Sequence, residues 1–326
     1  MEHQHNASTA PGWCVTEAQD ADEHAHNLRD WQQEYDQLGC GRFYGRIDEL
    51  ALPDVQLFRE HTSHALRQQC TVWPDSLWLG LAVNPQSCRI NGEPVAASEV
   101  MCRPGSLDFE LLTPDDFDIY GIVVRQQELQ RLAEVQGVEW SDEVWQTPKR
   151  GSDPQVLQAL RQDLHRLLTL AAMNGPRLPA RLQQELMLTR VLDWLQASRQ
   201  PPHPAPSHGR RRQVVERVRE YVRANPDELL TITDLCERVH VSRRTLQYSF
   251  ESVLGISPLK FLRLVRLNAV RRQLSRPVPE SQWQPLASIA ARWGFWHPGE
   301  FARDYRDLFG ENPSVTRERA SRMAAE

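Results

Sequence analysis

The sequence lacks the features of a membrane or secreted protein. No stretch approaches the roughly 18 consecutive apolar residues that a membrane-spanning helix requires. The first residues, among them Glu2, His3 and His5, contain no basic segment followed by an apolar core, so no signal peptide is indicated. The six cysteines form no C-x-x-C pair, which argues against a zinc knuckle or a dense disulfide framework. We therefore expect a cytoplasmic protein without a membrane span.

The signatures of several enzyme classes are also missing. There is no G-x-S-x-G, no P-loop and no G-x-G-x-x-G, so acyl, phosphoryl and hydride transfer all lack their usual motifs. His61 and His64 lie three residues apart but have no H-x-H companion and no neighbouring acid of the kind found in cupin metal sites. We expect no metal site, no catalytic cofactor and no enzymatic activity.

The charge is distributed unevenly along the chain. The length of 326 residues predicts two domains, and the net charge is only −5. Residues 209–326 nevertheless contain 21 Lys and Arg against 14 Asp and Glu, a net charge of +7, which leaves −12 for residues 1–208. Residues 200–209 contain four prolines and lie at this change of sign, so they are expected to form an extended, non-helical linker. The basic C-terminal domain is the part expected to contact a polyanion.

Hydrophobic periodicity predicts the organisation of the acidic part. Residues 1–28 are polar and aperiodic, which predicts a disordered leader with exposed histidines such as His24. Short alternating runs from 43 to 124, interrupted by turn sequences such as Asn91-Gly92, predict a β sheet or barrel. Leucines at helical spacing in 153–198 predict two helices that either form a homodimer or pack on the β structure. The expected domains are a leader at 1–28, a β-rich domain with its helical segment at 29–199, a linker at 200–209 and a C-terminal domain at 210–326.

The C-terminal domain contains a first predicted helix-turn-helix unit. Thr231 and Asp234 have the spacing of a capping box, which begins a short helix. Ser242 is the expected N-cap of a second helix, which ends at Gly255. The outward positions of this second helix hold long polar side chains that can reach phosphates and base edges, namely Arg243, Arg244, Gln247 and Tyr248. A solvated helix face without a partner is the alternative interpretation.

A connecting helix and a second unit follow. Ser257-Pro258 predicts the start of a helix that ends near Leu274. The arginines of this helix are expected to face solvent or phosphate, namely Arg263, Arg266, Arg271 and Arg272. The second unit begins near Leu286, and Pro298 begins its second helix, with Glu300 and Arg303 facing outward. Two such helices, about one turn of DNA apart, would enter successive major grooves.

Three segments resemble the AraC/XylS family of regulators: residues 235–246, 266–272 and 291–297, with Pro313 completing the pattern. The resemblance implies binding to double-stranded DNA, contact with RNA polymerase, and an α+β architecture with a β-rich, cupin-like N-terminal sensor domain and an all-α C-terminal domain. It also implies DNA contacts for Arg243, Arg244, Gln247, Tyr248, His297, Glu300 and Arg303, with Arg243 on phosphate. His240 and His297 depart from the pattern, because Gly is common in the first turn and Ser commonly caps the last helix; His caps poorly.

The N-terminal half resembles one branch of that family in residues 31–38, 72–76 and 109–116. Members of this branch activate ethanolamine-utilisation operons, so the resemblance implies ethanolamine and adenosylcobalamin as effectors, with another small metabolite as the alternative. Ethanolamine is a small cation with a hydroxyl group, and its pocket needs a carboxylate and an aromatic face. The candidates are Trp73, Trp78, Asp108, Glu110, Asp115 and Asp116, although tryptophans also suit a core and acids also suit turns.

Overall fold

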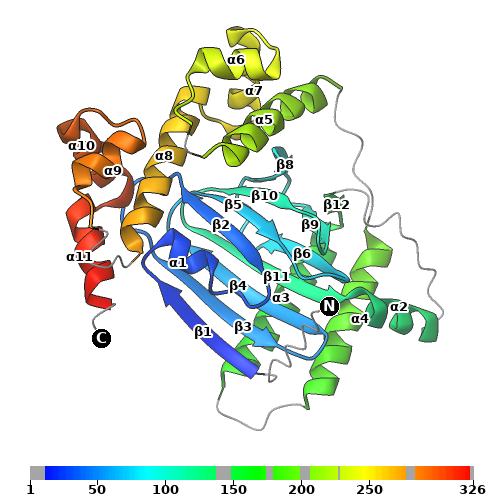
Figure 1. The fold of residues 1–326 in the computed structure, drawn as a ribbon. Helices are drawn as coiled ribbons and strands as arrows, with labels where there is room; N and C mark the ends of the chain where they lie inside the picture. Colours follow the sequence, from blue (N-terminus) through cyan, green and yellow to red (C-terminus); the bar gives the residue numbers. More distant parts are fainter. Residues whose placement is uncertain are drawn as a thin grey trace, which may run out of the picture.

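The computed structural model describes residues 12–136, 148–173, 179–198, 206–226, 228–276 and 283–323. An N-terminal domain of two antiparallel sheets with flanking helices is followed by an all-helical C-terminal domain (Figure 1). The predicted α+β class is confirmed. The two domains contact each other along the five-stranded sheet, where Leu112 joins the hydrophobic core of the helical domain.

The two sheets form the centre of the N-terminal domain. The seven-stranded sheet has the order β1-β3-β4-β11-β6-β9-β12 and the five-stranded sheet the order β2-β5-β10-β7-β8. The strands of the larger sheet are β1 (Gly12–Ala18), β3 (Gly45–Ala51), β4 (Val55–Thr62), β6 (Ser76–Ala82), β9 (Glu99–Pro104), β11 (Phe117–Arg125) and β12 (Lys149–Gly151). Those of the smaller sheet are β2 (Gln32–Gln37), β5 (Leu66–Thr71), β7 (Cys88–Ile90), β8 (Glu93–Val95) and β10 (Phe109–Thr113).

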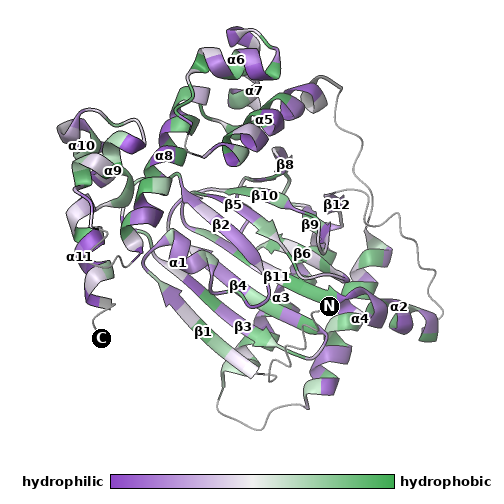
Figure 2. Cartoon of the chain, in the orientation of Figure 1, coloured by the Kyte–Doolittle hydropathy of each residue, from purple (hydrophilic) through white to green (hydrophobic). Residues whose placement is uncertain are grey.

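Strand β11 shows why the larger sheet is hydrophobic on both faces. Side chains alternate along a strand, so Ile119 and Val123 face the core between the sheets while Ile122 and Val124 face the opposite side. Figure 2 shows hydrophobic colouring along this strand. The outer face is covered by α2 (Gln126–Val135), α3 (Pro154–Ala172) and α4 (Ala180–Ala197). The two predicted leucine-rich helices therefore pack on the β structure; a homodimer remains a prediction.

The prediction of a disordered leader is wrong for residues 12–28. Strand β1 pairs with β3 along its whole length, and α1 (Ala21–Ala25) is capped by the carboxylate of Asp20, which accepts a hydrogen bond from the Asp22 amide at 2.9 Å. His24, expected to be exposed, is fully buried, with Nε2 3.1 Å from the Glu60 carboxylate. This segment shows no period because β1 is an edge strand and α1 is one short turn, so distant residues stabilise both.

The C-terminal domain is built around one long helix. Its helices are α5 (Pro206–Ala224), α6 (Ile232–Val239), α7 (Arg243–Leu254), α8 (Pro258–Ser275), α9 (Leu286–Arg292), α10 (Pro298–Phe309) and α11 (Pro313–Met323). Helix α5 begins at Pro206, so the non-helical linker expected at 200–209 is wrong for its last four residues. Phe261 and Leu262 of α8 pack in the core of the first unit, whereas Leu267 and Val270 pack in the core of the second. Helix α8 therefore belongs to both helix-turn-helix units.

Two adjacent arginines of α8 join the domains. Arg271 is buried and pairs with Asp20 of the N-terminal domain and with Glu311, whose carboxylate lies 3.1 Å away. Arg272 pairs with Asp36 of β2 at 2.8 Å. The expectation that these two arginines face solvent or phosphate is wrong, because carboxylates far away in the sequence compensate their charge.

Further polar contacts extend the interface between the domains. Arg67 of β5 lies 2.9 Å from Asp36 and 2.5 Å from Glu110, and Arg219 of α5 lies 2.5 Å from Glu110. Asn268 of α8 accepts a hydrogen bond from the Gln37 amide at 2.8 Å and donates one to the Gln37 carbonyl at 3.0 Å. Together with the α8 pairs, these contacts form a buried interdomain network.

We expect Leu164→Ala to destabilise the N-terminal domain by about 2 to 5 kcal/mol, because Leu164 is fully buried between α3 and the sheet and its truncation leaves a cavity. Leu170→Ala is the matched control on the same helix. Its side chain is 55% exposed, so its effect should stay within about 0.5 kcal/mol. Urea unfolding monitored by circular dichroism measures both; equal effects would contradict the assigned packing.

Candidate nucleic-acid interface

The first helix-turn-helix unit begins and turns as the sequence predicts. Thr231 and Asp234 form a reciprocal capping box, with the Thr231 amide 2.7 Å from the Asp234 carboxylate. His240 ends α6 in the left-handed region at φ 54°, the conformation that Gly adopts most easily. Ser242 Oγ then accepts the Thr245 amide at 3.2 Å and caps α7. Local hydrogen bonds thus cap the start of α6 and the start of α7, on either side of the turn.

One face of α7 is buried in the core of the first unit, and the opposite face is exposed to solvent. Leu246 and Phe250 are fully buried and fix the helix in the core of the first unit. The predicted contact residues lie on the outer side: Arg243, Arg244 and Tyr248 are exposed, and Gln247 is half-buried. The Arg244 guanidinium lies 5.5 Å from the centroid of the Tyr248 ring, and Gln247 donates a hydrogen bond to Glu251 at 2.6 Å. The structure therefore brings these four side chains together on one surface.

Helix α10 has the same construction in the second unit. Phe301 and Tyr305 are buried, and their packing holds the helix against α8 and α9. His297, Glu300 and Arg303 are exposed on its outer side. The side chain of His297 makes no capping hydrogen bond, so the expectation that it caps poorly is confirmed.

The other two arginines of α8 are not free phosphate ligands in this structure. Arg263 pairs with Asp304 of α10. Arg266 is half-buried and donates a hydrogen bond to the Leu230 carbonyl at 2.7 Å. The exposed arginines of α7 and α10 are therefore better placed to contact DNA than the arginines of α8.

The N-terminal domain contains a cavity of about 810 Å³ that two of the effector candidates line. Trp73 and Asp108 lie in its wall with Trp31 and Glu49. Trp78 is buried behind it, stacked on Phe109 at 4.5 Å and edge-on to Trp31 at 6.2 Å. Aromatic rings and carboxylates therefore lie together in the wall of this cavity, and its role as an effector site stays a prediction.

The remaining three candidates lie elsewhere. Glu110 is buried in the interdomain network, between Arg67 and Arg219. Asp115 accepts a hydrogen bond from the Ala65 amide at 2.7 Å, and Asp116 has a φ of 53°; both belong to a turn. None of the three lines the 810 Å³ cavity.

Glu49 is a cavity residue that our sequence reasoning missed. Its side chain is nearly buried, and burial raises its pKa above the ordinary value, partly offset by a hydrogen bond from Gln56 at 2.8 Å. Arg29 lies 3.6 Å from its carboxylate. Its spacing of two residues from Ile47 on the same strand was the available signal, because alternate residues share a face.

Two further absences hold for the described residues. They contain no group of three or more His, Cys, Asp or Glu side chains arranged to hold a metal ion. Within the same ranges, no helix has the length and apolar character needed to cross a bilayer.

The missing cap on α10 makes a testable prediction. Ser in place of His297 would accept a backbone amide at the helix N-terminus and complete a capping box with Glu300, so His297→Ser should raise stability by about 1 kcal/mol. Ser242→Ala, which removes an existing cap, should lower stability by a similar amount. Thermal unfolding compares them; destabilisation by His297→Ser would show that the imidazole has another structural role.

Comparison with known proteins identifies the helical domain. Residues 235–319 match the family model described as a helix-turn-helix domain. The probable thc operon regulatory protein of Rhodococcus erythropolis is 37% identical over 101 residues, which are 31% of this chain and 30% of that protein. The XylDLEGF operon transcriptional activator 2 of Pseudomonas putida is 35% identical over 101 residues, 31% of this chain and 63% of that protein.

A crystal structure of a probable AraC family transcriptional regulator from Rhodopseudomonas palustris CGA009 is 37% identical and covers 33% of this chain and 97% of that one, with a TM-score of 0.31. By contrast, the match covers only 30% of the Rhodococcus protein and 63% of the Pseudomonas protein, which is less than two thirds of the length of either curated relative. Residues 235–319 of this chain therefore form a helix-turn-helix domain that is similar to the DNA-binding domains of AraC/XylS-type transcriptional regulators.

Proposed function

We propose that the protein is a cytoplasmic transcriptional activator that binds a bipartite DNA site and whose N-terminal domain senses a small molecule. The observation that carries the proposal is the pair of exposed helix faces on α7 and α10, held by one shared helix. Helix α8 has 18 residues, or about 27 Å by the rise of an α-helix, which is of the order of one turn of DNA.

Each exposed side chain has a role that suits its chemistry. Arg244 and Gln247 contact base edges in the major groove, since Arg pairs bidentately with guanine and Gln with adenine. Arg243 contacts phosphate and Tyr248 packs against the sugar-phosphate edge. On α10, Arg303 contacts a base edge and Glu300 accepts from cytosine. His297 lies at the helix N-terminus, where phosphates bind.

Ethanolamine is the proposed effector, and the cavity of the N-terminal domain is its site. Glu49 and Asp108 supply negative charge there, and Trp31 and Trp73 supply aromatic surface for an ammonium group. Arg125 already lies 5.4 Å from the Trp73 ring, so this ring accepts a cation in the structure. The second candidate is another small cationic metabolite, which the same groups would bind.

Adenosylcobalamin does not fit this cavity. A volume of about 810 Å³ is typical of a site for a drug-sized molecule, and the corrinoid with its nucleotide and adenosyl groups is considerably larger. Its role as a co-effector rests on the family resemblance, and no residue of this chain is assigned to it. The proposed interactions are therefore those of ethanolamine and DNA.

We expect Arg244→Ala to weaken binding to the specific site by about 1 to 3 kcal/mol and to relax base preference in one half of it. Arg217→Ala, an exposed arginine on α5 outside both recognition helices, is the control and should preserve base preference. Fluorescence anisotropy with a selected operator and single-base variants measures both. Unchanged affinity and preference in Arg244→Ala would exclude the base contact.

Calorimetry with ethanolamine tests the effector. Because the ammonium group pairs with the ionised carboxylate, Glu49→Gln should weaken binding at least tenfold, and binding to the wild type should weaken as pH falls toward the raised pKa of Glu49. Asp48→Asn alters the next residue, which faces the other side of β3 and pairs with Arg46, and should bind normally.

The same titration, repeated with adenosylcobalamin and with other small amines, distinguishes ethanolamine from the second candidate. No heat with ethanolamine, in the presence or absence of the corrinoid, would reject it as the effector and leave the DNA-binding assignment intact.

A further inference from the structure

The N-terminal domain contacts the C-terminal end of each recognition helix, α7 and α10. Arg89 of β7 donates a hydrogen bond to the Ser252 carbonyl of α7 at 2.9 Å. On α10, the Leu308 carbonyl accepts hydrogen bonds from the Gly41 amide at 2.9 Å and from the Gln37 side chain at 2.7 Å. Both carbonyls lie in the last turn of their helix, where backbone acceptors have no partner within the helix. Each recognition helix is therefore completed by a different segment of the other domain.

Close packing accompanies the contact with α7. The positive charge of Arg89 suits the partial negative charge at the C-terminal end of the helix. Gly92 lies in the turn between β7 and β8, and a Cβ atom there would lie 2.3 Å from the Val253 side chain, so the backbone of this turn lies directly against α7. Glu93 of β8 pairs with Arg212 of α5. The β7–β8 hairpin therefore contacts two helices that share the core of the first unit.

The segment that contacts α10 also reaches both helix-turn-helix units. Leu38 directly follows Gln37 at the end of β2, and its side chain is half-buried. It packs against the hydrophobic core of the first unit and against that of the second. Residues 37–41 therefore contact the helical domain at two cores and at one helix end.

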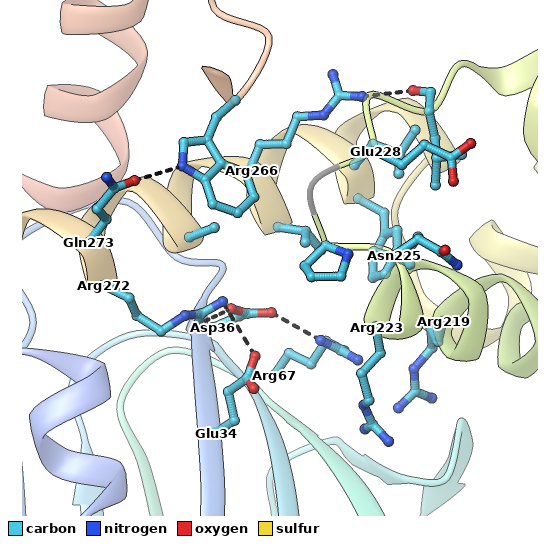
Figure 3. Close-up of a pocket in the computed structure, with 18 of the residues that line it drawn as sticks. Glu34, Asp36, Arg67, Arg219, Arg223, Asn225, Glu228, Arg266, Arg272 and Gln273 are labelled. Carbon is cyan, nitrogen blue, oxygen red and sulfur yellow. Dashed lines mark hydrogen bonds and ion pairs between the residues drawn. The ribbon is translucent and has the colours of Figure 1, made fainter. Parts of the chain in front are cut away.

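Helix α8 by itself leaves one motion open. Each unit is attached to α8 through one core, and packed helices permit small sliding and rotation about such a contact. The packing of α8 on the N-terminal domain is incomplete, because a cavity of about 400 Å³ lies between strands β2 and β5 and helices α5 and α8 (Figure 3). The β7–β8 hairpin and residues 37–41 give each unit a second attachment, at the end of its recognition helix.

We propose that the N-terminal domain sets the spacing and relative orientation of the two recognition helices, with Gln37 and Arg89 as positioning residues. The inference rests on the proposed function, because this spacing matters to a protein that binds a bipartite site. One additional base pair between the half-sites displaces the second by about 3.4 Å and rotates it by roughly 35°. Units that are fixed at two points cannot follow this change, whereas units that rotate about α8 follow part of it.

Fluorescence anisotropy of the full chain tests the proposal on a selected operator and on versions with one base pair added or removed between the half-sites. For the wild type, either change should lower affinity about tenfold or more, because one recognition helix loses its base contacts. For the Gln37→Ala/Arg89→Ala double variant, the loss should be about threefold or less, because the units regain rotation about α8. A general loss of stability would lower affinity for all three DNAs alike and leave this ratio unchanged.

The control is a double variant of the same residue types. Arg46 pairs with Asp48, and Gln86 donates a hydrogen bond to the Asp116 carbonyl, so both side chains bond within the N-terminal domain. Arg46→Ala/Gln86→Ala should keep the wild-type ratio. If thermal unfolding shows that the test variant does not fold, Arg89→Ala decides alone, since it removes one half-buried side chain from a short strand, and it should at least halve the ratio.

A measurement without DNA separates this inference from the proposed function. Nitroxides attached at the exposed Tyr248 of α7 and Arg303 of α10 report the distance between the recognition helices by pulsed electron paramagnetic resonance. A ketone-bearing unnatural residue at each position takes the label and leaves the native cysteines unmodified. The wild type and the control should give one narrow distance distribution, and Gln37→Ala/Arg89→Ala a broader one.

Three results would contradict the proposal: no preference of the wild type among the three spacings, an unchanged ratio in a folded Gln37→Ala/Arg89→Ala or Arg89→Ala protein, or a distance distribution in that protein as narrow as in the wild type. Absence of sequence-selective DNA binding by the wild type would reject the proposed function instead. The distance measurement would then still decide whether Gln37 and Arg89 position the two helices.

Discussion

Buried ion pairs of the interdomain network join the N-terminal domain to helices α5 and α8 of the C-terminal domain. Arg271 and Arg272 are neighbours on α8, yet they pair with Asp20 and Asp36 of the N-terminal domain. Removing one partner of such a buried pair leaves an uncompensated charge, which is strongly destabilising. Because α8 also contributes to the cores of both helix-turn-helix units, the same helix holds the units relative to each other and relative to the N-terminal domain. Helix α8 is therefore packed in the same cores that hold α7 and α10.

A cavity of about 400 Å³ between the two domains lies on the same pair of strands as the cavity of the N-terminal domain. Gln32 of β2 and Thr71 of β5 line the cavity of the N-terminal domain, whereas Glu34 of β2 and Gln69 of β5 line the interdomain cavity. Strand β2 also contains Asp36, which pairs with Arg272. Strand β2 therefore lines both cavities and is ion-paired to α8.

The helix-turn-helix units were largely predictable because their determinants are local. The capping box of Thr231 and Asp234, the cap at Ser242 and the missing cap at His297 all involve residues within about three positions of each other, so the sequence order displays them directly. The lining of the cavity in the N-terminal domain was less predictable. Trp73 and Asp108 were identified by chemistry and line the cavity, but Glu49 was missed, since alternation along β3 gives the face of its side chain and not the distant residues that enclose the cavity with it.

The amino-acid sequence by itself determined the two-domain division, the β-rich and all-α character of the parts, and the bounds of the recognition helices, because hydrophobic period and capping are short-range properties. Only the tertiary structure decided that residues 12–28 are ordered, that Glu110 is an interdomain ion-pair partner, and that Arg271 faces inward. Arg271 and Asp20 are 251 positions apart, and neither residue shows in its local sequence that the other will neutralise it. Long-range pairing of strands and charges appears only when the chain is folded, and in this protein it decides which cations remain free for DNA.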